Sequence, residues 1–150
     1  MRVFNNQNAH RQGVLSSGIG GQRIMYFCLV IDDSDVIRKV ARKILESKDH
    51  VVVDANTAEE ALDHCKQNMP DIIMLDWKLP AMTASEFLLA LKELPGETFP
   101  QILYCTTEAE PQDLALAFRK GIDDYILKPY DRETLLPKID ALGEKIRALA

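Results

Sequence analysis

Short apolar runs alternate with longer amphipathic segments from residue 26 to the end of the chain, and this alternation restricts the chain to few folds. Strands are predicted at 26–31, 51–55, 72–75, 101–105 and 125–127. Apolar spacing near 3.6 predicts helices within 36–45, 58–65, 87–94 and 114–118, and a last helix over 132–149. Because the strands are almost continuously apolar, we predict an α/β fold: a doubly wound, five-stranded parallel sheet covered on both faces.

Capping residues and prolines mark the helix boundaries. Thr57 followed by Glu60 has the capping-box pattern, and Pro111 suits the first position of its helix. Pro137 is discordant, because a helix that starts after Asp131 would hold it beyond the first turn, where proline costs about 3 kcal/mol. We therefore expect the last helix to kink or to start late.

The length of 150 residues suits one ordinary domain with a hydrophobic core. No apolar stretch reaches the roughly 18 to 20 residues of a membrane span, and no secretory leader opens the chain, which predicts a cytoplasmic protein without membrane insertion. The first 24 residues carry a charge of +3, so the remainder carries −8 of the total of −5. A body this acidic argues against direct binding to nucleic acid.

The amino-terminal segment 1–24 is polar, rich in glycine and free of acidic residues. We predict a disordered extension, followed by one domain over 25–150. Two other interpretations stay open for this segment: an organelle transit segment, although it lacks the expected amphipathic face, and a translation start at Met25.

The cysteines and histidines show neither metal-ligand spacing nor a CxxC motif. The thiols lie within or beside apolar segments and are predicted to be buried: Cys28, Cys65 and Cys105. No ligand or catalytic role is expected for the histidines, which are scattered along the chain: His10, His50 and His64.

Polar side chains stand where four predicted strands end. Asp32-Asp33 closes the first strand, Asp76 the third, Thr106-Thr107 the fourth, and Lys128 follows the fifth. Parallel sheets of this kind bind ligands at the carboxyl ends of their strands. We therefore expect these acids, the hydroxyl of Thr106 and the ammonium of Lys128 to converge.

Several carboxylates at one site repel one another unless a cation binds there. Hard oxygen ligands with few protein carboxylates suit Mg²⁺. A carboxylate beside a metal, a lysine and a hydroxyl provides the groups that phosphoryl transfer needs: a nucleophile, and cations and a donor for the phosphoryl oxygens. Asp76 is the predicted nucleophile, Asp32 and Asp33 are the predicted metal-binding pair, and Lys128 and Thr106 are predicted to contact phosphoryl oxygens.

Four motifs, in this order, resemble the signature of two-component response-regulator receiver domains. They are Ile31-Asp32-Asp33-Ser34, Leu75-Asp76-Trp77-Lys78-Leu79-Pro80, Thr106, and Lys128-Pro129-Tyr130. Each motif alone is weakly specific, whereas four at compatible spacing are strongly so. The resemblance covers residues 26 to about 148 and implies a flavodoxin-like (βα)5 fold and a stand-alone, chemotaxis-type receiver, a signalling domain rather than an enzyme.

The resemblance implies that Asp76 is the phosphoacceptor, which takes its phosphoryl group from a histidine kinase or histidine phosphotransfer protein by self-catalysed transfer. Mg²⁺ would bind Asp33, Asp76 and the backbone carbonyl of Lys78, with Asp32 acting through water. The aspartyl phosphate would be lost by self-catalysed dephosphorylation.

A conformational switch is also implied by the resemblance. The phosphoryl group would draw Thr106 inward, Tyr125 would turn into the vacated space, and Lys128 would contact the phosphoryl group. The change would appear on a face within 109–120 and 125–141, where an unknown downstream protein, or a second copy after phosphorylation, would bind.

The chain departs from the family pattern around the site. Ala84 replaces a frequent glycine, which leaves it either strained or a better helix former. Thr107 replaces a smaller residue, and Lys78 and Glu108 would flank the mouth of the site. We expect these three to slow the loss of the aspartyl phosphate, through bulk and a Lys–Glu pair.

Simpler structural roles stay open for the same residues. Asp76 could cap a turn, Asp32 and Asp33 could cap the following helix, and Tyr125 could be a half-buried packing residue. Thr106 could be an ordinary strand residue and Lys128 a solvated loop lysine.

Two other functions stay open for the whole chain. One is a haloacid-dehalogenase-type phosphatase, because Asp33-Ser34-Asp35 superficially resembles the DxD motif of that family. In those phosphatases the nucleophile lies on the first strand, whereas Asp76 follows the third. The other is a receiver-like interaction module that is never phosphorylated.

Overall fold

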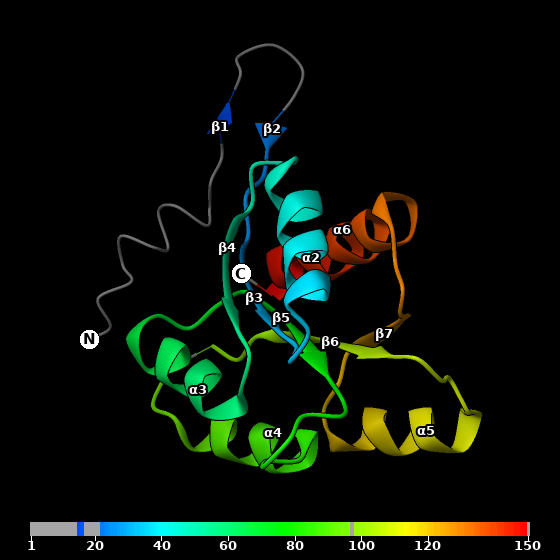
Figure 1. The fold of residues 1–150 in the computed structure, drawn as a ribbon. Helices are drawn as coiled ribbons and strands as arrows, with labels where there is room; N and C mark the ends of the chain where they lie inside the picture. The colour runs from blue at the N-terminus through cyan, green and yellow to red at the C-terminus, as the bar shows by residue number, and fades with distance from the viewer. Residues whose placement is uncertain (1–14, 17–21, 97, 150) are drawn as a thin grey trace.

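A computed structural model describes residues 15–16, 22–96 and 98–149 (Figure 1). Its central sheet has five strands in the order β4-β3-β5-β6-β7, all paired in parallel. The strands are β3 (Phe27–Ile31), β4 (Val51–Ala55), β5 (Ile72–Asp76), β6 (Gln101–Thr106) and β7 (Asp124–Leu127). The predicted five-stranded parallel sheet is confirmed.

Helices cover both faces of the sheet, as Figure 1 shows. One face carries α2 (Asp35–Glu46) and α6 (Arg132–Leu149), and the other carries α3 (Ala58–Gln67), α4 (Ala84–Glu93) and α5 (Pro111–Lys120). The switch of faces occurs between β3 and β5, because the chain adds β4 on one side of β3 and all later strands on the other. This is the topological switch point at which such sheets bind ligands.

Alternate side chains of the central strands pack into two separate hydrophobic cores, one on each face of the sheet. In β5, Ile73 and Leu75 pack toward α3, α4 and α5, whereas Ile72 and Met74 pack toward α2 and α6. All of β5 is buried, since both of its faces are covered and both of its edges are paired. The near-continuous apolar runs in the sequence follow from this double burial.

The helix starts follow local rules. Thr57 accepts a hydrogen bond from the N–H of Glu60, as the capping-box pattern predicts, but the Glu60 carboxylate turns to the N–H of Asn56. The complete reciprocal box lies instead at Thr83 and Glu86, at the start of α4.

The two ends of α5 also follow the sequence. Pro111 is its first residue, as predicted, and Gly121 ends the helix with a φ of 119°. That left-handed conformation is one that glycine adopts without strain.

The expectation of a late start for the last helix was wrong. The α6 helix begins at Arg132, and Pro137 lies inside it. Asp131 caps the helix by accepting a hydrogen bond from the N–H of Thr134 at 3.0 Å. Proline removes one internal hydrogen bond, but the burial of Leu135, Ile139 and Leu142 against the sheet offsets that loss.

The predicted disordered extension falls largely on residues 1–14 and 17–21, which lie outside the described part of the chain. Within the extension, β1 (Leu15–Ser16) and β2 (Gln22–Arg23) form a short antiparallel pair. Each of the three cysteines is free and buried, as predicted. None of the helices in the described ranges is long and apolar enough to cross a bilayer.

Acidic side chains tie adjacent strands together at the amino end of the sheet. Asp71, just before β5, accepts a hydrogen bond from the N–H of Phe27 at 2.8 Å and returns its own N–H to the Phe27 carbonyl. Asp123, just before β7, makes the same reciprocal pair with Ile102, where its carboxylate accepts the N–H at 2.7 Å. Each acid therefore satisfies a backbone donor at the start of a neighbouring strand.

His50 has the corresponding place before β4. Its Nδ1 accepts a hydrogen bond from the N–H of Tyr26 at 3.0 Å, and its ring stacks on the Tyr26 ring at 5.5 Å between centroids. Gly143 of α6 lies against the same tyrosine, and a Cβ at that glycine would come within 2.2 Å of the ring. Burial lowers the pKa of His50, so the imidazole stays neutral and keeps its acceptor.

Candidate functional site

The carboxyl ends of four neighbouring strands bring the predicted polar residues to one edge of the sheet. Asp32 follows β3, Asp76 ends β5, Thr106 ends β6 and Lys128 follows β7. Because these strands are adjacent in the order β3-β5-β6-β7, residues far apart in sequence become neighbours. The convergence expected from the sequence is observed for the acids and the lysine.

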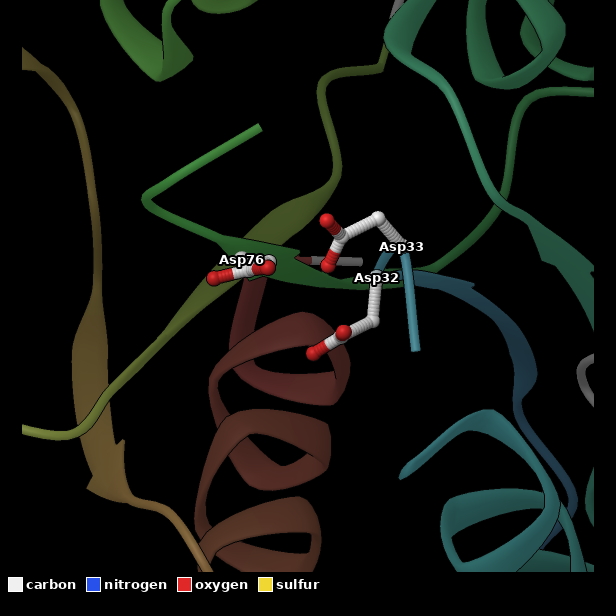
Figure 2. Close-up of side chains that lie close together, drawn as sticks. All are labelled: Asp32, Asp33 and Asp76. Atoms are coloured by element: carbon white, nitrogen blue, oxygen red, sulfur yellow. The ribbon is translucent and has the colours of Figure 1, made fainter. Parts of the chain in front are cut away.

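Three carboxylates form the centre of this edge. Asp32, Asp33 and Asp76 each offer an oxygen, and these oxygens lie within 4.8 Å of one another. Figure 2 shows their carboxyl groups turned toward a common space. Asp33 belongs to the short loop between β3 and α2. Asp32 and Asp76 are buried, whereas Asp33 is exposed. A set of hard oxygen donors this close together fits a hard divalent cation such as Mg²⁺.

The ammonium of Lys128 lies between two of these acids. Its Nζ donates to Asp32 Oδ2 at 3.0 Å and to Asp76 Oδ1 at 3.2 Å. The backbone N–H of Lys128 donates to the Thr106 carbonyl at 2.7 Å, which anchors the residue just beyond β7. Only 14% of the lysine side chain is exposed, so the interpretation of a solvated loop lysine does not hold.

The pKa values of Asp76 and Lys128 are both raised in the folded protein. Burial, followed by the charge of Asp32, raises the pKa of Asp76, against the opposing effect of Lys128 and of the Lys78 N–H. Burial by itself lowers the pKa of Lys128, but its hydrogen bonds and charge interactions with Asp32 and Asp76 outweigh burial and raise it. Lys128 is therefore a fixed cation, and Asp76 carries its negative charge at a free-energy cost.

The two carboxylates of the acid pair differ in their hydrogen bonding. Asp32 Oδ1 accepts the N–H of Ser34 at 2.9 Å, and Oδ2 accepts Lys128. Asp33 has no hydrogen bond or ion pair to any other residue in the described part of the chain. Asp33 is thus the acid whose oxygens are free for an outside ligand.

Around Asp76, the Lys78 N–H donates to Oδ1 at 3.2 Å, and the other oxygen, Oδ2, accepts no hydrogen bond from the described residues. Thr106 is buried, and its hydroxyl is occupied by Glu108: it donates to the Glu108 carbonyl at 2.9 Å and accepts the Glu108 N–H at 3.1 Å. The Thr106 hydroxyl is therefore bonded to the backbone of Glu108 and not to the acid cluster.

The residues predicted to gate the site lie around its edge. Lys78, Thr107 and Glu108 are all exposed. No ion pair joins Lys78 to Glu108 among residues 22–96 and 98–149, so the expected Lys–Glu pair is not formed in this conformation.

Tyr125 is half-buried on the face covered by α3, α4 and α5. Lys138 of α6 lies over its ring, with Nζ 5.0 Å from the centroid, and the same ammonium bonds Asp124 at 3.0 Å. No hydrogen bond joins Tyr125 to Thr106 within the described ranges. The structure therefore shows Tyr125 as a packed residue under a cation.

Comparison with known proteins decides the family. A family model for the response regulator receiver domain matches residues 28–140. The chain belongs to the response regulator receiver family. The match covers both acidic motifs, the strand-end threonine and the lysine of the site.

Relatives and solved structures agree with the assignment. The chain is 30% identical over 122 residues to the phosphate regulon transcriptional regulatory protein PhoB of Klebsiella pneumoniae, covering 81% of this chain and 53% of PhoB. It is 28% identical to the chemotaxis protein CheY of Halobacterium salinarum, covering 80% of this chain and 96% of CheY. The crystal structure of CheY4 of Vibrio cholerae superposes with a TM-score of 0.74 at 30% identity, covering 79% of this chain and 98% of CheY4.

Membership in the receiver family fixes the kind of domain. The chain contains a receiver domain, the phosphate-accepting domain of two-component response regulators, and its fold is the flavodoxin-like fold of CheY. Receiver domains bind Mg²⁺ through acidic residues and work with histidine kinases. The haloacid-dehalogenase alternative is excluded by this match. The chain spans about half the length of the PhoB relatives that it matches.

One departure from the receiver pattern is resolved by the backbone. Ala84 is the first residue of α4, behind the N-cap Thr83, and it is buried without a positive φ. The left-handed residue of this loop is Ala81, at φ 69°. Ala84 is thus the better helix former rather than a strained substitute for glycine.

Sequence reasoning missed residues that support the receiver site. Arg38 of α2 donates from Nη1 to the Asp32 carbonyl at 2.6 Å. Trp77, which follows Asp76, and Tyr104, two residues before Thr106, pack their rings together at 4.6 Å between centroids. The position of Arg38, one helical turn after Ser34, was a signal that it faces back toward the acid pair.

Proposed function

We propose that Asp76 is the phosphoacceptor and that the chain signals by binding other proteins. The observation that carries this proposal is the environment of Asp76. One of its oxygens is held by Lys128 and the Lys78 N–H, the other is free, and the unpartnered Asp33 lies beside it. The donor is a phosphohistidine of a histidine kinase or histidine phosphotransfer protein, and the protein works in the cytoplasm.

The transfer uses groups that the chain already places. The free oxygen of Asp76 attacks phosphorus, an O–P bond forms, the N–P bond of the phosphohistidine breaks, and the imidazole leaves with the electron pair of that bond. Lys128 stays beside Asp76 and balances the charge on a phosphoryl oxygen. Thr106 leaves the backbone of Glu108 and donates to another phosphoryl oxygen.

The acid cluster is the proposed Mg²⁺ site. Asp33, Asp76 and the backbone carbonyl of Lys78 would bind the ion directly. Asp32 would act through water, because both of its oxygens already accept hydrogen bonds from the protein. When bound, Mg²⁺ neutralises charge on the acids and on the phosphoryl oxygens.

The proposed output surface lies within 109–120 and 125–141, which hold α5, most of β7 and the first part of α6. Three large apolar side chains are exposed on the first two of these elements: Leu116 at 41%, Phe118 at 43% and Leu127 at 48%. Exposed apolar side chains of this kind suit a protein partner, or a second copy after phosphorylation. A turn of Tyr125 on β7 would change this surface directly.

The test is phosphorylation with a small donor. The purified protein, incubated with Mg²⁺ and acetyl phosphate, should gain a hydroxylamine-labile adduct of about 80 Da, the mass of one phosphoryl group. Asp76→Asn should abolish the adduct, whereas Asp54→Asn, on β4 and outside the cluster, should keep it. Failure of the wild type to gain the adduct would favour the interaction module that is never phosphorylated. An unchanged adduct in Asp76→Asn would move the acceptor to another residue.

A further inference from the structure

Asp32, whose carbonyl forms the peptide bond with Asp33, is held by hydrogen bonds of its backbone and of its carboxylate. The Asp32 N–H donates to the Ala55 carbonyl at 3.1 Å, and the Asp32 carbonyl accepts Arg38 Nη1 at 2.6 Å. The Asp32 carboxylate is held by Ser34 and Lys128. Every polar group of this residue is therefore engaged, and the carbonyl is the one held by a long side chain from the next helix.

We infer that Arg38 is a positioning residue for the proposed metal site, acting on Asp33 through the backbone. The carbonyl of Asp32 and the N–H of Asp33 belong to one planar peptide unit. Fixing that carbonyl therefore fixes the plane from which the Asp33 side chain departs. Asp33 itself is exposed and has no partner in the described chain, so no contact of its own side chain orients it.

Arg38 is built to hold this position. Its side chain is only 13% exposed, and its second terminal nitrogen pairs with Asp35 in the first turn of α2. Its backbone N–H donates to the Ser34 carbonyl at 3.1 Å, so the residue belongs to the helix that begins directly after the acid pair. A planar guanidinium can bond the carbonyl and the carboxylate together, whereas an ammonium at the end of a lysine is a single point donor.

An electrostatic role and a positioning role of Arg38 predict opposite changes in Mg²⁺ affinity when its side chain is removed. Loss of a cation near the carboxylates strengthens the attraction of the site for Mg²⁺. Loss of the hydrogen bond to the Asp32 carbonyl frees the peptide and weakens binding, as removal of residues that orient metal ligands does. The sign of the change in affinity therefore separates a positioning role from an electrostatic one.

The inference rests on the proposed Mg²⁺ site and is tested by binding rather than by phosphorylation. Mg²⁺ is titrated into the full chain, and binding is followed by the fluorescence of Trp77, the single tryptophan, and by the Mg²⁺-dependent rise in Tm. The variants are Arg38→Met and Arg38→Lys. The matched control is Arg42→Met, because Arg42 lies one turn further along α2, where it bonds the Val52 carbonyl at 3.0 Å and pairs with Glu46 and Asp54 rather than with the acid cluster.

We expect Arg38→Met to weaken Mg²⁺ binding about tenfold and Arg38→Lys to restore part of the affinity. The control should stay within about twofold of the wild type. Unchanged or tighter binding in folded Arg38→Met overturns the inference. If that variant does not fold, Arg38→Lys decides: affinity equal to the wild type overturns the inference, and weaker binding supports it. Absence of Mg²⁺ binding by the wild type would instead overturn the proposed metal site.

Discussion

The two ends of the parallel sheet use acidic residues in opposite ways. At the amino end, Asp71 and Asp123 each accept a backbone N–H from the start of a neighbouring strand, so each carboxylate satisfies a donor of the fold. At the carboxyl end, the acids Asp32, Asp33 and Asp76 lie within 4.8 Å of one another, and Lys128 is bonded to Asp32 and Asp76. The comparison separates carboxylates that hold the sheet together from carboxylates that are held in place for chemistry.

The largest effect should come from the amino end. Asp71→Ala should lower the free energy of unfolding by about 2 to 3 kcal/mol, because it leaves the buried N–H of Phe27 without its acceptor. Urea unfolding measures the change, and Asp63→Ala, an exposed acid of α3, is the control. A loss below about 0.5 kcal/mol, the size of an ordinary surface substitution, would remove the contrast between the two ends.

A substitution at the carboxyl end should have the opposite sign. In EDTA at pH 7, Asp76→Asn should raise the free energy of unfolding by about 1 kcal/mol, because the folded protein no longer holds that buried charge beside Asp32. The pKa of Asp76 is raised above 3.8 in the folded protein, so the wild type recovers stability as it takes up this proton. The gain should therefore shrink as the pH falls and vanish below about 3.8.

Urea unfolding of both proteins from pH 7 to pH 4 checks this prediction. A destabilised Asp76→Asn at pH 7 would mean that the hydrogen bond to Lys128 outweighs the repulsion. Carboxylates at both ends of the sheet would then stabilise the folded protein.

A smaller effect on stability is expected at His50, just before β4. Its side chain accepts a backbone N–H, as those of Asp71 and Asp123 do. Because burial lowers the pKa of His50 in the folded state, against the opposing charge of Asp140, the unfolded chain binds this proton more readily. The contribution of a neutral His50 is present above pH 6.5 and is lost as the pH falls, by less than about 1 kcal/mol. His50→Asn keeps an acceptor for the Tyr26 N–H without titrating.

Thermal unfolding between pH 7.5 and 5.5 should show a steeper fall in Tm for the wild type than for His50→Asn. Equal slopes would show that the histidine does not titrate over this range.

The smallest effect is expected at the mouth of the site. Lys78→Ala should speed the loss of phosphate from Asp76 by up to about fivefold, since an exposed charge of this kind contributes at most about 1 kcal/mol. The rate is measured on purified phosphorylated protein. A rate that is unchanged or slower in the variant rules out a role for Lys78 in protecting the phosphate, and the bulk of Thr107 would be left as the candidate.

The carboxyl end was largely readable from the sequence, and the amino end was not. Asp76 and Lys128 stand directly at strand ends, so strand prediction alone places them. The pairing of Asp71 with Phe27 depends on which strands are neighbours, and the order of strands is not written in the local pattern. The late start expected for α6 failed for a related reason: local propensity counted the penalty of Pro137 but not the tertiary burial that offsets it.

Within the site, sequence reasoning identified the acids and Lys128, but it missed Arg38 and the hydrogen bonding. Nothing in the sequence indicates that the Thr106 hydroxyl is engaged by Glu108, or that Lys138 covers Tyr125. Both contacts depend on side-chain orientation, which is decided by packing after the backbone is placed.

The hydrogen bonds of the Thr106 hydroxyl set the resting population of the proposed switch. The hydroxyl donates to the Glu108 carbonyl and accepts the Glu108 N–H, and each bond contributes about 1 kcal/mol. A bias of about 2 kcal/mol leaves the hydroxyl released in about 3% of molecules before any phosphate arrives. Under the proposed role of Thr106, the unphosphorylated protein would carry a basal output of a few per cent, and phosphorylation would amplify a conformation that already exists.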